Sequence, residues 1–212
     1  WNLEGYVFHE PVRWKADSFN LVGFCLDPQS PPTFEQFFAG SAAHRHHRIY
    51  RLMDGHWTLV ANPTGTVMRA GEALWVHCRG SSDYQGPLSV KLPAGRQLVL
   101  DEGGQAQVVL ANAANDPSAV RIETVGPGGG LPLTYVVRGI TTGRMDDLPL
   151  DLPADHRIPT LEPGEQTALR LRVRHERMTA PSQGALLRFS HECGAQVWVP
   201  VMARRADLSS NP

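Results

Sequence analysis

The chain has 212 residues, and 42% of them are hydrophobic, which suits one large domain or two domains of about 100 residues each. Its formal net charge is only −1, so no overall field favours nucleic acid or an anionic membrane as a partner. No apolar run approaches the ~20 residues of a membrane-spanning helix, and we therefore expect no membrane insertion.

The aromatic first half of the chain contains one clear helix signal, at residues 33–39. Thr33 is placed to cap this helix, and Gln36 follows three residues later, as a capping box requires. The three phenylalanines of the segment share one face at i, i+3 and i+4 spacing, and a sheet must bury them. Around the helix we expect short strands at 21–26, 49–52, 56–60, 73–78 and 88–92, the second and third joined by the tight turn Asp54-Gly55.

The second half is aliphatic and alternates regularly, most clearly at 169–174, where leucine and valine alternate with three arginines. Successive side chains of a strand point to opposite faces, so this segment buries its apolar residues and exposes its arginines. Similar patterns predict strands at 97–100, 106–112, 120–125, 133–138, 167–174, 185–191 and 196–203. Strands of this number, separated by turns, predict an immunoglobulin-like antiparallel β-sandwich.

The composition changes near Pro93-Ala94-Gly95, and we place a domain boundary there. The predicted protein is mostly β, with a small β-rich module and one short helix over residues 1–93 and a sandwich over 94–205. Residues 206–212 are expected to be a disordered tail. The acidic, proline-rich stretch 139–157 is expected to be a long connection.

Four segments of the first half form a pattern: Phe19–Phe24, Pro32–Phe34, Ile49–Leu52 and Gly71–Val76. Together they resemble a module of large secreted or surface proteins of bacteria. In that family an Asn-Leu-x-Gly-aromatic strand opens the module, a Gly-x-x-Tyr/Leu-Trp-Val strand nears its end, and immunoglobulin-like domains follow. The resemblance implies an extracytoplasmic protein, secreted or at the cell surface, with a structural or binding role, and it carries over no catalytic residue.

We therefore expect a non-catalytic structural or binding module of a larger extracytoplasmic bacterial protein. A carbohydrate-binding module attached to a secreted enzyme is one alternative. An enzyme in its own right is a second, and a structural subunit of a surface layer or filament is a third. The expected partners are other domains of the same polypeptide and protein or polysaccharide at the cell surface. The sequence contains no nucleophile elbow, phosphate loop or zinc-ligand spacing, so it predicts neither an enzyme nor a cofactor.

Aromatic side chains of the first module are the first candidate binding surface. Trp57, Trp75 and Tyr84 lie near turns or strands, and sugar-binding proteins stack pyranose rings on such side chains. Burial in the core of the module is the alternative, since large aromatic residues dominate the cores of small domains.

A basic stripe on the second domain is the other candidate surface. Arg170, Arg172 and Arg174 share the exposed face of their strand, and Arg188 on a neighbouring strand would extend the stripe. Guanidinium groups suit the carboxylates of an acidic polysaccharide or a protein partner. The alternative is an ordinary solvated face of a sandwich.

Neither of two ligand-rich segments predicts a metal site. The histidines at 44, 46 and 47 have no acidic residue nearby, and a solvated loop is the simpler interpretation. The stretch 146–155 carries four carboxylates but lacks the central glycine of a calcium loop, which leaves calcium binding open. Cys25 and Cys78 end two predicted strands, so they either form a disulfide, if those strands are neighbours, or remain free thiols.

Overall fold

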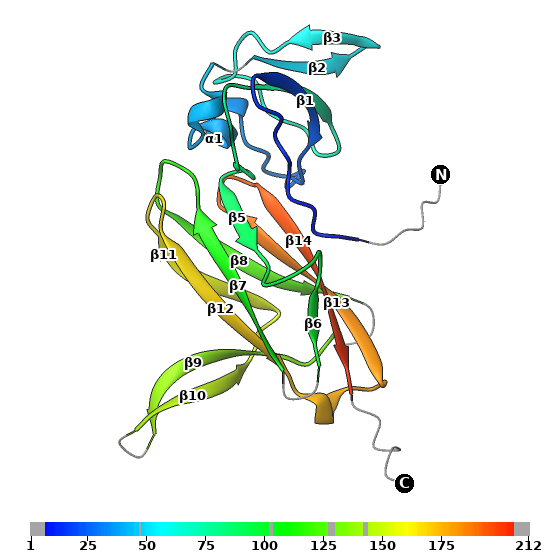
Figure 1. Ribbon diagram of the computed structural model, residues 1–212, viewed down its shortest axis with the longest axis vertical. Helices are drawn as coiled ribbons and strands as arrows, with labels where there is room; N and C mark the ends of the chain where they lie inside the picture. The colour runs from blue at the N-terminus through cyan, green and yellow to red at the C-terminus, as the bar shows by residue number, and fades with distance from the viewer. Residues whose placement is uncertain (1–6, 47, 102–103, 127–129, 142–143, 206–212) are drawn as a thin grey trace.

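The computed structural model describes residues 7–46, 48–101, 104–126, 130–141 and 144–205 and contains two β-rich parts that follow each other along its long axis (Figure 1). Of the described residues, 52% lie in strands and 6% in helices, so the chain is mostly β, as predicted. The tail predicted at 206–212 lies outside the described residues. None of the helices in the described ranges has the length and apolar character needed to cross a bilayer.

A four-stranded antiparallel sheet, here called the module sheet, builds the N-terminal part. Its strand order is β1-β4-β2-β3. Its strands are β1 (Ser18–Gly23), β2 (Ile49–Met53), β3 (His56–Leu59) and β4 (Ala73–Cys78). β2 and β3 form the predicted hairpin, and Asp54 and Gly55 in its turn both have positive φ, which a tight hairpin turn requires.

Helix α1 (Phe34–Phe38) covers the inner face of the module sheet. The predicted capping box is formed: Thr33 Oγ1 accepts a hydrogen bond from the Gln36 backbone N–H at 3.2 Å, and Gln36 Oε1 accepts one from the Thr33 N–H at 2.9 Å. The three phenylalanines of the helix are buried in one core with apolar residues of β2 and β4. A short 3₁₀ helix, η1 (Ala42–His44), follows.

The remainder of the chain forms an immunoglobulin-like sandwich of two five-stranded sheets, antiparallel except for the pair β6–β14. One sheet has the order β10-β9-β12-β7-β5, and the other has the order β11-β8-β13-β14-β6. The elements are β5 (Leu88–Lys91), β6 (Leu98–Leu100), β7 (Gln105–Asn112), β8 (Ser118–Val125), β9 (Leu133–Thr141), β10 (Arg144–Asp151), β11 (Asp155–Leu161), β12 (Gln166–Val173), η2 (His175–Arg177), β13 (Ser182–His191) and β14 (Gln196–Arg204).

Two strands occupy the stretch that the sequence predicted to be a long connection. β10 pairs with β9, with Met145 opposite Ile140, and β11 joins the other sheet beside β8. The prediction was wrong because both are edge strands, rich in charge and each containing a proline, Pro149 and Pro159. Such residues are excluded from central strands but are common at sheet edges.

Strand β5 belongs to the sandwich by sheet membership. It pairs with β7, with Leu88 opposite Asn112, whereas the sequence prediction placed 88–92 at the end of the first module. Alternation shows which side chains of a strand are buried, but it does not show which sheet supplies the hydrogen bonds. The sandwich therefore includes residues 88–91.

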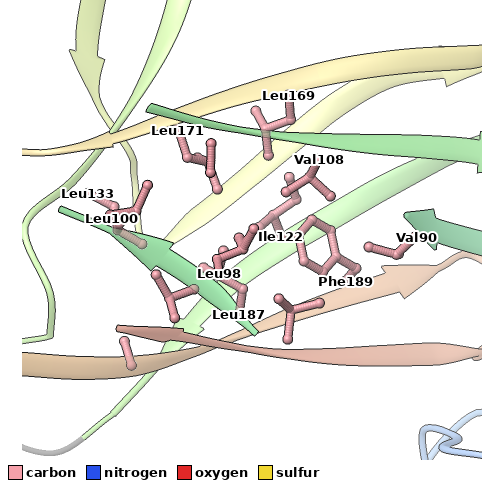
Figure 2. Close-up of a cluster of buried hydrophobic side chains, with 14 of the residues drawn as sticks. Val90, Leu98, Leu100, Val108, Ile122, Leu133, Leu169, Leu171, Leu187 and Phe189 are labelled. Carbon is pink, nitrogen blue, oxygen red and sulfur yellow. The ribbon is translucent and has the colours of Figure 1, made fainter. Parts of the chain in front are cut away.

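Aliphatic side chains from both sheets fill the sandwich core, as Figure 2 shows. Leu169 and Leu171 of β12 point inward, as the alternation predicts, and lie in one cluster with Leu187 and Phe189 of β13. Leu171, Leu187 and Phe189 are fully buried. This core holds the two sheets of the sandwich together.

Backbone hydrogen bonds and apolar contacts join the module to the sandwich. Leu26 forms an antiparallel β-bridge with Ala195, and the Asp27 N–H donates to the carbonyl oxygen of Gly194 at 2.8 Å. Ala195 is also buried in the core of the module, among the phenylalanines of α1. The turn between β13 and β14 is therefore part of both units.

His191 lies beside this junction, and its buried Nε2 atom has no hydrogen-bond partner among the described residues. Burial lowers the pKa of His191 from its ordinary value, against a smaller opposing effect of the Glu192 charge. Burial also lowers the pKa of His156. Below about pH 6.5 the unfolded chain therefore binds more protons than the folded chain, so stability is lost as the pH falls through that value.

We expect the midpoint of thermal unfolding to be lower at about pH 5.5 than at about pH 7.5. The replacement His191→Gln should reduce this difference, because it removes a group that the folded state holds neutral. The control His56→Gln changes an exposed side chain at the β2–β3 turn and should leave the difference as it is. If His191→Gln has the same pH dependence of thermal unfolding as the wild type, His191 is not a source of the loss of stability at low pH.

Candidate functional site

The outer face of the module sheet carries aromatic and leucine side chains that we call the aromatic platform. Directly opposite residues of antiparallel strands share a face, and the register places Leu21 and Tyr50 on either side of Trp75. The same rule, followed across all four strands, gives the members of the platform as Phe19, Leu21, Tyr50, Leu52, Trp57, Leu59, Trp75 and His77.

Four apolar side chains of the platform are strongly exposed. Leu21 is 57% exposed, Leu52 50%, Trp57 43% and Leu59 49%, and Trp75 is half-buried between them. Single exposed apolar residues are normal on a soluble protein, but a contiguous group of them marks an interaction surface. The predicted residues Trp57 and Trp75 are thus brought together, whereas the three leucines were not predicted.

The rings of the platform stand edge to face. The centroids of Trp57 and Trp75 are 6.1 Å apart with an interplanar angle of 66°. Phe19 contacts Tyr50 at 5.6 Å and 70°, and it contacts His77 at 5.1 Å and 74°. The rings therefore form a ridged apolar surface rather than a coplanar stacking plane.

A buried ion pair fixes the platform from below. Arg51 lies on the inner face of β2, and its Nε is 2.5 Å from Glu72 Oε1 while its Nη2 donates to Glu72 Oε2 at 2.8 Å. The same guanidinium lies over the Phe34 ring, 5.6 Å from its centroid. A bidentate pair of this kind is geometrically specific, so it holds β2 against the loop before β4.

A basic cavity of about 400 Å³ adjoins the platform at its Phe19 end. Four of its lining residues are basic, namely Arg48, Arg79, His46 and His77, and of the described lining residues only Asp17 carries a carboxylate. The residues that line this cavity are Asp17, Ala43, His44, His46, Arg48, His77 and Arg79. Sequence analysis did not find the cavity, because its members come from three segments that are far apart in the sequence.

Tyr84 was predicted as a binding residue, and the structure contradicts this. Its ring is buried in the module core beside Phe37 and Phe38, and its hydroxyl donates to the backbone carbonyl of Phe37. Burial, with a smaller effect of Cys193, raises the pKa of Tyr84 far above its ordinary value. Tyr84 lies in the segment after β4, and its ring packs against the phenylalanines of α1, so it is part of the module core.

Aspartates of β10, which lies beyond β9 in the same sheet, neutralise much of the predicted arginine stripe. Arg170 forms a bidentate pair with Asp147 on β10, at 2.6 and 2.9 Å, and Arg174 Nε is 2.7 Å from Asp151 Oδ1. The hydrogen bond from Arg170 lowers the pKa of Asp147, and the bonds from Arg174 and Arg177 lower that of Asp151. Two of the four acidic residues that were predicted to lie in a loop, Asp147 and Asp151, are thus ion-pair partners of the stripe.

The rest of the stripe is also occupied within the molecule. Arg172 donates to Gln105 Oε1 at 2.9 and 3.1 Å. Arg188 does not extend the stripe, because β13 and β12 lie in different sheets. It pairs instead with Glu123 and lies over the Trp198 ring, 5.4 Å from the centroid.

No group of three or more histidine, cysteine or acidic side chains in the described ranges is placed to hold a metal ion. His44 is buried, with Nδ1 2.6 Å from Ser41 Oγ, and His46 Nε2 is 2.8 Å from Arg79 Nη1. His47 lies outside the described residues. Asp147 and Asp151 of the acidic stretch are engaged with arginines, as described above.

All three cysteines are free thiols. A disulfide between Cys25 and Cys78 is not formed, because the register pairs Cys78 with Ser18 at one end of β1. Cys25 follows Gly23 at the other end of that strand, so the two thiols are far apart although β1 and β4 are neighbours, as that prediction required.

No protein-family model and no curated protein matches the chain. Similar solved structures include the Salmonella enterica SafA pilin in complex with the SafB chaperone, at 16% identity and TM-score 0.37 over 58% of each chain. The E. coli chaperone DraB is 14% identical with TM-score 0.37 over 56% of each chain. A FixG-related protein from Vibrio parahaemolyticus is 12% identical with TM-score 0.35 over 57% of this chain and 98% of its own.

The matched region spans less than two thirds of the length of the two chaperone structures. At these identities the similarity concerns fold alone, and it assigns no ligand, partner or activity to the chain.

Proposed function

We propose that this chain is a non-catalytic binding module of a larger extracytoplasmic bacterial protein, with the aromatic platform as its binding surface for a protein partner. The observation that carries the proposal is the joint exposure of Leu21, Leu52, Trp57 and Leu59 on one sheet face. Burial of apolar surface contributes roughly 25 cal/mol per Å². A sheet fixed from below presents this surface without reorganisation on binding.

The composition of the platform favours a protein over a polysaccharide. Leucine side chains pack against apolar side chains, whereas sugar recognition depends on flat rings and on polar groups that bond the hydroxyls. The contact between Trp57 and Trp75 is edge to face, and besides the indole N–H groups the Tyr50 hydroxyl is the one polar group in the two rows that hold Leu59 and Trp57. The two tryptophans favour the carbohydrate-binding alternative, but the leucine side chains around them disfavour it.

The edge strands of the sandwich disfavour the alternative of a filament subunit. Strand addition between copies needs a long edge strand with free N–H groups. The edge strands β10 and β11 contain Pro149 and Pro159, and the edge strands β5 and β6 have four and three residues. These features protect edges from pairing with another chain.

The four-segment pattern of the first half supports the extracytoplasmic setting, and its residues have structural roles. Asn20 Oδ1 accepts from the Lys15 N–H at 2.7 Å, and Asn20 Nδ2 donates to the Ser18 carbonyl at 3.0 Å, so this side chain shapes the entry to β1. Gly71 has a φ of 75° in the turn before β4. The pattern thus describes how the module folds, while ligand choice lies with the platform.

The test uses the double variant Trp57→Ala/Leu59→Thr. Proteins of the native cell envelope that bind the immobilised wild-type chain are identified, purified and measured against both forms by calorimetry. We expect the double variant to bind such a partner at least about tenfold more weakly, because an exposed aromatic anchor typically contributes about 2 kcal/mol or more at an interface.

Ile140→Thr is the matched control. Ile140 is 74% exposed on β9, and Figure 1 shows the β9–β10 hairpin at the end of the molecule opposite the module sheet. This variant should bind the partner as the wild type does. Equal affinity of the wild type and the platform double variant would refute the proposal, and loss of binding to a glycan array in the double variant would favour the carbohydrate alternative.

A further inference from the structure

We propose that the basic cavity receives a carboxylate of the same partner segment whose apolar side chains lie on the aromatic platform. The inference rests on the proposed function and specifies its partner: an apolar extended segment preceded or followed by an acidic residue. It treats the platform and the cavity as one composite site.

The two surfaces are continuous. Phe19 and His77 lie opposite each other on β1 and β4, and His77 also lines the basic cavity. The Arg48 guanidinium lies over the Phe19 ring, 5.3 Å from its centroid, and points along the same face as Tyr50. A ligand that leaves the apolar rows of the platform therefore meets the arginine directly.

The charge of the cavity selects an anion. Arg48 and Arg79 form no ion pair with a carboxylate in the described part of the chain, whereas the buried Arg51 is fully paired with Glu72. Asp17 is held to the cavity wall, where its Oδ1 accepts from the Gly80 N–H at 2.7 Å. Two guanidinium groups, one of them stacked on a ring, suit a planar carboxylate that accepts paired hydrogen bonds.

The spacing sets the length of the segment. Arg48, directly before β2, and Leu52, which lies opposite Trp57, are four residues apart along β2, which at roughly 3.3 Å per residue is about 13 Å. An extended partner segment covers this distance with about four residues. The acidic residue is thus expected about four positions from the side chain that contacts Trp57.

The test uses a pair of synthetic peptides as probes. Both are acetylated and carry alternating leucine and threonine; one begins with two aspartates and its twin begins with two asparagines. Chemical shifts of the full chain are followed by nuclear magnetic resonance at low salt. We expect the aspartate peptide to bind about fivefold more tightly than its twin, with this advantage shrinking as salt screens exposed charges.

Three variants separate the contributions. Arg48→Gln/Arg79→Gln should bring the aspartate peptide down to the affinity of its twin and leave the twin unchanged. Arg48→Lys keeps the charge and should retain most of the difference. Arg144→Gln, on the distant β10, is the matched control and should retain all of it.

Equal binding of the two peptides to the wild type would overturn this inference and leave the proposed function standing. Absence of any shift in the platform with either peptide would overturn it as well, because no extended apolar segment then binds there. The proposed function fails separately, when Trp57→Ala/Leu59→Thr binds the purified partner as the wild type does.

Discussion

Replacing Phe189 with alanine is expected to lower the free energy of unfolding by about 3–5 kcal/mol. The Phe189 ring is fully buried in the middle of the sandwich, among leucines and valines of both sheets (Figure 2). Removing it loses the transfer free energy of the ring and leaves a cavity that β-strands, held by their ladders, close only in part. Urea unfolding followed by circular dichroism measures the change.

Phe189→Leu serves as the control for this prediction. It keeps most of the apolar volume, and such exchanges usually cost less than about 1.5 kcal/mol. If alanine and leucine at this position cost the same, the loss does not come from a cavity, and the ring is not a central support of the core.

The sandwich could be predicted wherever a strand is central and half of its residues are apolar. The alternation at 169–174 placed β12, and the prediction of 185–191 recovered most of β13. These strands bury one face against the opposite sheet, so their own sequence records the burial pattern. The capped helix at 33–39 was predictable for a similar reason, since its cap and its phenylalanine face are local.

The edge strands β10 and β11 could not be predicted in this way. β10 has no buried residue in its described pattern, and its aspartates resemble those of a loop. What makes it a strand is its ladder with β9, together with the ion pairs of Asp147 with Arg170 on β12 and of Asp151 with Arg174 directly after β12. These partners are distant in sequence, so local composition carries no signal of them.

The candidate site shows the same division. Trp57 and Trp75 were singled out by residue type, whereas the leucines around them gained significance only from the register that places them on one exposed face. Tyr84 has the same chemical character as the tryptophans but lies on the buried side of the module. Residue type indicated which side chains could form an aromatic binding surface, but only the pairing of the strands shows which of them are exposed to solvent.

A glycine in the turn between β13 and β14 lies at the junction between the module and the sandwich. Gly194 has a φ of 91°, in the turn between β13 and β14. Its carbonyl accepts from the Asp27 N–H at 2.8 Å, and the Gln196 N–H donates to the Cys25 carbonyl at 2.9 Å. A Cβ atom at this position would overlap the carbonyl oxygen of Ser30.

Gly194→Ala is therefore expected to cost about 3–5 kcal/mol, from the left-handed conformation together with a backbone overlap that no side-chain rotation relieves. Because the overlap lies at the junction, the module should separate from the sandwich before either core unfolds. Hydrogen exchange should then show lost protection at Asp27 and Gln196 while the sandwich core around Phe189 stays protected.

Gly164→Ala isolates the contribution of the overlap. Gly164 also has a positive φ, 78°, but a Cβ there would meet no atom within 4 Å, so this variant should cost only about 1–2 kcal/mol. The difference between the two variants measures how strongly the β13–β14 turn holds the module. If Gly194→Ala costs no more than Gly164→Ala, the turn moves aside easily, and the aromatic platform is not held at a fixed orientation to the sandwich.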